Sequence, residues 1–83
     1  MELAKKCGNL IIKCILRELN TQKNLQKLGK VEYTLIDTKD PNELQFILTG
    51  DFSERGKSVF NKYEIIGTIS IYEVEFIRVS KCA

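Results

Sequence analysis

Two stretches in the middle of the chain alternate between apolar and polar residues, and a short turn-forming segment joins them. The first is Val31–Asp37 and the second is Leu44–Gly50, with Thr38–Glu43 between them. A period of two is typical of half-buried β-strands. Asp40-Pro41-Asn42 favours a tight connection, because proline fixes φ and asparagine tolerates unusual backbone angles. The pattern therefore predicts a β-hairpin.

The alternation also predicts which side chains share a face of this hairpin. We expect Tyr33 and Phe46 to point into the core together with their apolar neighbours. The outward set is then Glu32, Thr34, Ile36, Gln45, Ile47 and Thr49. Ile36 and Ile47 make this outer face partly apolar, so it is a candidate surface for docking onto another protein.

Two further strands are predicted downstream, at Val59–Ser70 and Val74–Val79. Gly67 falls where a strand would bend or carry a bulge. Between the hairpin and these strands, Asp51–Ser58 loses the alternation, and we interpret it as a loop or single helical turn that crosses between strands.

The N-terminal third permits two interpretations. Residues 1–8 are expected to form a loose arm or one helical turn. The β-branched residues of Asn9–Thr21 favour a long first strand buried on both faces, although the same residues also follow helical spacing. The alternative is a helix over Leu3–Leu19 packed on a four-stranded antiparallel sheet. We expect Asn20–Lys30 to be a long basic connection, with Gly29 ending any helical turn within it.

Composition limits the classes of function. With 83 residues, 43% hydrophobic and 29% charged, the chain is expected to be one globular domain, and the net charge of +2 gives only a weak attraction for anions. We expect no membrane span, and an intracellular location in the cytoplasm or nucleus. Without histidine, and with three scattered cysteines, no metal set, cofactor or catalytic pair is expected, so we predict a protein that is not an enzyme.

The order of the predicted strands, and the residues at their ends, are similar to those of a known family. Tyr33–Asp37 ends in apolar-x-Asp, Glu43–Asp51 contains a strand ending in glycine, and Asn61–Ile69 carries apolar-Gly-x-apolar. This pattern of strand ends resembles that of the single-stranded-DNA-binding OB domains of the replication protein A type. The resemblance implies a mainly β, five-stranded Greek-key barrel over residues 9–79, with a tail at 80–83. A small sandwich or another small barrel stays open as an alternative.

The resemblance further implies binding of single-stranded nucleic acid, directly or as the small subunit of a complex. Candidate contacts are basic side chains for the phosphate backbone and one ring for stacking a base: Lys23, Lys27, Lys30, Lys39, Arg55, Lys57, Lys62 and Tyr72. The alternative function is a protein-interaction module, such as a small inhibitor or assembly factor. It would act through an exposed strand edge or the face of Ile36 and Ile47.

Overall fold

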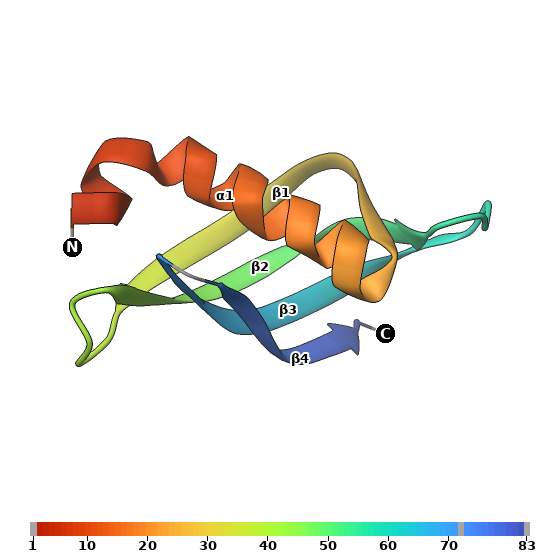
Figure 1. Ribbon diagram of the computed structural model, residues 1–83. Helices are drawn as coiled ribbons and strands as arrows, with labels where there is room; N and C mark the ends of the chain where they lie inside the picture. The colour runs from red at the N-terminus through yellow and green to blue at the C-terminus, as the bar shows by residue number, and fades with distance from the viewer. Residues whose placement is uncertain (1, 72, 83) are drawn as a thin grey trace.

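One helix and four strands make up the structure, a computed structural model that describes residues 2–71 and 73–82. In chain order they are α1 (Glu2–Lys23), β1 (Leu25–Asp37), β2 (Glu43–Glu54), β3 (Phe60–Ser70) and β4 (Val74–Lys81). The strands form an antiparallel meander in the order β1-β2-β3-β4, and α1 lies across one face of it (Figure 1).

The sheet stays open, because no pairing joins β1 to β4 within the described residues. The prediction of a closed five-stranded barrel is therefore wrong. The alternative, an N-terminal helix packed on a four-stranded antiparallel sheet, is confirmed. The fold is mainly β by residue number, with the helix supplying a second layer.

The segment Asn9–Thr21, predicted as a strand, is helical because helical spacing buries its apolar residues better. Ile11, Ile15 and Leu19 recur every four residues and are all buried against the sheet. A strand would instead have placed Leu10 in the core, yet Leu10 is 60% exposed. The preference of β-branched residues for strands is worth only about 1 kcal/mol or less per position, so packing on the sheet decides the outcome.

The helix ends in a left-handed residue. Asn24 has a φ of 57°, and its N–H donates to the carbonyl of Asn20 at 3.1 Å. Asparagine tolerates this conformation and commonly caps helix C-termini. The chain then reverses at once into β1, so most of the predicted basic connection is the end of α1 and the start of a strand. Gly29, at φ 73°, lies in a register shift of β1 and does not end a helix.

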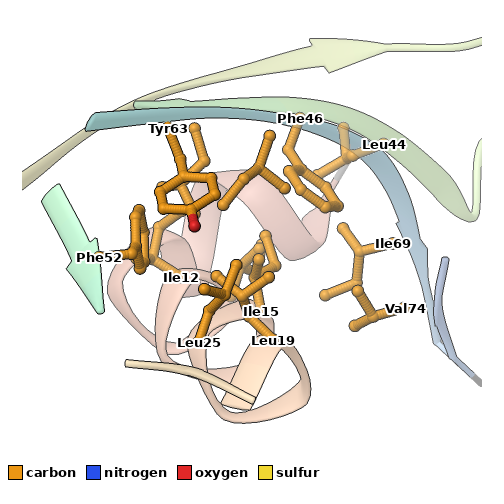
Figure 2. Close-up of a cluster of buried hydrophobic side chains, with 13 residues drawn as sticks. Ile12, Ile15, Leu19, Leu25, Leu44, Phe46, Phe52, Tyr63, Ile69 and Val74 are labelled. Atoms are coloured by element: carbon orange, nitrogen blue, oxygen red, sulfur yellow. The ribbon is translucent and has the colours of Figure 1, made fainter. Parts of the chain in front are cut away.

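The core lies between α1 and the inner face of the sheet. Figure 2 shows the buried side chains of both layers pointing toward one another. Phe46 and Phe52 are fully buried in β2. Their rings meet Phe76 and Tyr63 edge to face, with centroids 5.9 and 6.0 Å apart. Such edge-to-face pairs add about 0.5–1.5 kcal/mol each beyond the area that they bury.

The two faces of the central hairpin are as predicted. Tyr33 pairs with Leu48 and Leu35 with Phe46, so the apolar residues share the helix side. The predicted outward residues also share one face, where Glu32 pairs with Thr49, Thr34 with Ile47, and Ile36 with Gln45. In the turn, a carboxylate oxygen of Asp40 accepts the N–H of Asn42 at 2.8 Å, which is a local Asx-type hydrogen bond.

The predicted crossing segment Asp51–Ser58 is wrong in its first half. β2 continues through Glu54 with β3 beside it, and only a short turn follows. The predicted irregularity at Gly67 is confirmed, because the register of β3 and β4 shifts between Ile66 and Gly67. A Cβ at Gly67 would overlap the carbonyl oxygen of Glu75 and lie 2.6 Å from Cζ of Phe46. Close packing of β4 and Phe46 therefore requires glycine here.

Candidate interaction site

The edge of the sheet formed by β1 is the most regular unpaired feature of the fold. From Glu32 to Asp37 its residues pair with β2 without a register shift, and no strand pairs with its other side within residues 2–71 and 73–82 (Figure 1). We call Val31–Asp37 the β1 edge. Every second residue of such an edge directs its backbone N–H and C=O away from the sheet, where another strand can pair with them.

Apolar side chains follow the helix side of the β1 edge. Val31 and Leu35 are partly buried and pack against the core, and Tyr33 between them is 42% exposed. On the other face, Ile36 is 39% exposed. The core therefore continues to the rim of the sheet without a charged residue on the helix side until Asp37, so the rim presents apolar surface along an edge that no described strand covers.

The opposite edge, β4, is poorly suited to pairing. It is eight residues long, and its register is broken between Phe76 and Arg78, which leaves Ile77 as the extra residue of a bulge. Arg78 forms an ion pair with Glu64 at 2.9 Å across the outer face. Bulges, charges and short length are the devices by which natural sheets protect their edges. The β1 edge has no bulge between Glu32 and Asp37, and on its helix side it carries no charge before Asp37; its one other charge, Glu32, lies on the outer side.

The outer face of the sheet is the second candidate surface. Ile36 and Ile47 lie on it as predicted, on neighbouring strands, and Ile47 pairs with Ile66 of β3. Ile66 was not identified from the sequence, although the alternation of β3 places its side chain on the other face of the strand from the buried Ile65. Polar side chains surround these isoleucines, so the face is a mixed surface and not a continuous apolar patch.

Two of the predicted nucleic-acid contacts come together on this face. Lys30 and Lys62 line a shallow hollow of about 250 Å³ together with Glu32 and Asp51. The two carboxylates offset the two ammonium groups, which weakens any attraction for phosphate. A phosphate track through this hollow is therefore not strongly favoured by its charges.

Two others are engaged locally at the end of β2. The Arg55 guanidinium donates to the backbone carbonyl of Asn20 and to its side-chain oxygen, which ties the β2–β3 turn to the end of α1. Lys57 lies 2.9 Å from the carboxylate of Glu54. The hydrogen bond and charge of Lys57 lower the pKa of Glu54, and Glu54 in turn raises the pKa of Lys57.

The remaining predicted contacts lie apart. Lys23 is the last residue of α1, and Lys27 donates from Nζ to the carbonyl of Gly29 at 3.2 Å. Lys39 belongs to the β1–β2 turn, at the opposite end of the sheet from Lys57. Tyr72 lies outside the described residues. The predicted set therefore does not form one continuous track across the molecule.

Other chemistry is sparse in the described part of the chain. No three histidine, cysteine, aspartate or glutamate side chains gather there to hold a metal ion, and Cys14 and Cys82 are free thiols. Among the described helices, none combines the length and apolar character that a membrane crossing requires. No family model matches the chain, and neither the curated proteins nor the solved structures include one with significant similarity to it.

Proposed function

We propose that the chain is a non-catalytic protein-interaction module and that its β1 edge receives an extended segment of a protein partner as a fifth strand. The supporting observation is the contrast between the two edges. β1 offers Glu32–Asp37 in unbroken register beside an apolar rim on the helix side, whereas the register of β4 is broken by a bulge at Ile77.

The affinity of such a contact would come from two sources. Each backbone hydrogen bond contributes about 0.5–1.5 kcal/mol net, and an added strand opposite seven residues makes several of them. Side chains of the partner strand would also cover the exposed part of Tyr33 and the rim around Leu35. A partner segment is therefore expected to alternate, with apolar residues on the helix side and polar residues on the outer side.

Tyr33→Lys tests this proposal. A lysine there places a charge on the helix side of the edge, a device that opposes strand addition, at a side chain exposed enough for the fold to survive. Ile77→Lys on β4, where Ile77 is 61% exposed, is the matched control.

Tagged wild-type and variant chains would be incubated with nuclease-treated cell extract, and the captured proteins compared. We expect a protein captured by wild type and by Ile77→Lys to be lost with Tyr33→Lys, while the circular dichroism of the three chains agrees. Equal capture by Tyr33→Lys would show that the β1 edge is not the contact.

Binding of single-stranded nucleic acid is a second candidate, supported by the charges at one end of the sheet. Lys27, Lys57, Lys62 and Lys81 lie near the β2–β3 turn, where Lys27 and Lys81 are on the helix side of the sheet and Lys62 is on the outer face; Phe60, also on the outer face, is 57% exposed. Stacking of a base on such a ring is worth roughly 1–3 kcal/mol, and binding through lysines weakens steeply with salt.

A labelled oligonucleotide titrated at low and high salt tests this candidate. Binding that falls steeply with salt and weakens in Lys27→Ala or Phe60→Ala would support it. No binding at low salt would exclude it, as would binding that neither substitution changes.

A further inference from the structure

We propose that the partner at the β1 edge is a second copy of this chain, and this inference rests on the proposed function, whose partner it names. An antiparallel strand pair has two-fold symmetry, so one edge can pair with itself in a closed dimer. A two-fold axis at Thr34 pairs all seven residues of Val31–Asp37 with those of the second copy. An axis at Tyr33 would set Asp37 opposite Gly29 of the bulge, and an axis at Leu35 would set Val31 opposite Lys39 of the β1–β2 turn.

This register matches the side chains by face. Tyr33 of each copy lies opposite Leu35 of the other, on the helix side, and this occurs twice across the axis. Aromatic and aliphatic cross-strand neighbours of this kind stabilise sheets. The exposed part of the Tyr33 ring is covered, and the two cores join at the rim through an eight-stranded sheet with both helices on one side.

Charge favours the same arrangement. The end of the sheet at the β1–β2 and β3–β4 turns is acidic, with one lysine among the carboxylates Asp37, Asp40, Glu43, Glu73 and Glu75. The end at the β2–β3 turn is basic, with two carboxylates among the cations Lys23, Lys27, Lys30, Arg55, Lys57, Lys62 and Lys81. In this register Asp37 lies opposite Val31 of the other copy, so the acidic β1–β2 turn of each copy lies beside Lys27 and Lys30 of the other, which steers association and fixes orientation.

The helix adds a second contact. Figure 1 shows the N-terminal turns of α1 extending past the β1 side of the sheet, and Leu10 in this half of the helix is exposed. In the dimer these turns lie above the rim of the second copy. Specific dimers bury about 1,200 Å² or more, which seven residues of strand pairing do not reach alone, so the helices complete the interface.

The first test is the mass of the purified chain. At about 100 μM, where an interface with a Kd of about 1 μM is largely occupied, sedimentation should give twice the monomer mass of 9.5 kDa. Tyr33→Lys should give the monomer mass, and Ile77→Lys should remain a dimer.

The second test is the register. Thr34→Cys, in a chain with Cys7, Cys14 and Cys82 replaced by serine, should form an intermolecular disulfide, because opposed residues have Cα atoms about 4.5–5.5 Å apart. Glu32→Cys is the control, because its two copies would lie four residues apart along the strand, roughly 13 Å.

A monomer throughout, or a dimer that Tyr33→Lys leaves intact, would overturn the self-pairing. A dimer in which Glu32→Cys cross-links and Thr34→Cys does not would overturn it as well, because the axis would lie elsewhere. If the purified chain is a monomer while capture of another protein from extract still depends on Tyr33, the proposed function stands and this inference alone is lost.

Discussion

Replacing Gly67 with alanine should destabilise the protein more than any other single methyl group added to β3. The new Cβ would point into the core, overlap the carbonyl oxygen of Glu75 and lie 2.6 Å from Cζ of Phe46. The carbonyl belongs to the backbone of β4, and the Phe46 ring is held edge to face against Phe76. Neither neighbour can move without disturbing the β4 bulge or the core.

The size of the effect follows from two opposing contributions. Overpacking a close-packed core costs about 1–3 kcal/mol, and the reduced freedom of the unfolded chain returns about 0.4–1 kcal/mol. A net loss of about 2 kcal/mol in the free energy of unfolding is therefore expected, in the upper part of the range that the two contributions allow. Because unfolding entropy is about 2.1 cal/mol/K per residue, a chain of 83 residues should lose roughly 12 °C in Tm.

Thermal unfolding followed by circular dichroism measures this loss. Thr68→Ala is the matched control, since Thr68 is the next residue and faces outward opposite Gln45. A substitution of that kind should change stability by about 0.5 kcal/mol, or roughly 3 °C. If Gly67→Ala melts as close to wild type as Thr68→Ala does, the close approach of Glu75 and Phe46 to Gly67 is incorrect.

Three further substitutions test the helix assignment and the surface ion pair. Ile15→Ala should lower the free energy of unfolding by about 2–5 kcal/mol, because Ile15 is fully buried. Leu10→Ala should lower it by about 0.5 kcal/mol or less, because Leu10 is exposed. Equal losses for the two variants in chemical denaturation would contradict the packing of α1. Lys57→Met should raise the Glu54 pKa toward its ordinary value, as measured by NMR titration. Because the pKa of Glu54 is lower in the folded protein than in the unfolded chain, the Glu54–Lys57 ion pair stabilises the fold above the unfolded pKa, and this stabilisation is lost as pH falls through the folded pKa. An unchanged Glu54 pKa in Lys57→Met would refute this effect of Lys57.

The hairpin could be predicted from the sequence because its signals agree at every level. Val31–Asp37 and Leu44–Gly50 alternate, and Asp40-Pro41-Asn42 supplies a matching turn, so the register follows once one face must be buried. Gly67 was identifiable for a similar reason, since a glycine inside an alternating strand indicates a bulge or a close approach.

The first element could not be assigned, because its local signals conflict. Ile11, Ile12 and Ile15 favour a strand by side-chain type and a helix by spacing, and only the sheet beneath them decides which face is buried. The mistaken strand then led to the barrel, because a fifth strand was needed to close it. Residues Leu25–Leu28 were not predicted as a strand, because Gln26 and Lys27 interrupt the apolar residues and give no alternating pattern. These residues nevertheless pair with the end of β2.

The interaction site was predictable only in part. The outward positions of Ile36 and Ile47 follow from the alternation, but a strand becomes an edge only through the topology of the sheet. Tyr33 illustrates this limit: the pattern places it correctly on the core face, yet its position at the rim leaves it 42% exposed. The lysines could not be placed, because their positions depend on turns and on partners such as Glu54 that lie close only after folding.

Hydrogen exchange of individual backbone amides in the wild-type chain tests the central claim most directly. In Val31–Asp37, the N–H groups that point away from β2 should exchange fast in dilute protein and become protected as concentration rises or partner protein is added. The corresponding groups of β4 should exchange at the same rate throughout. If the outward amides of β1 remain as fast as those of β4 under every condition in which the protein associates, the β1 edge is not the interaction site.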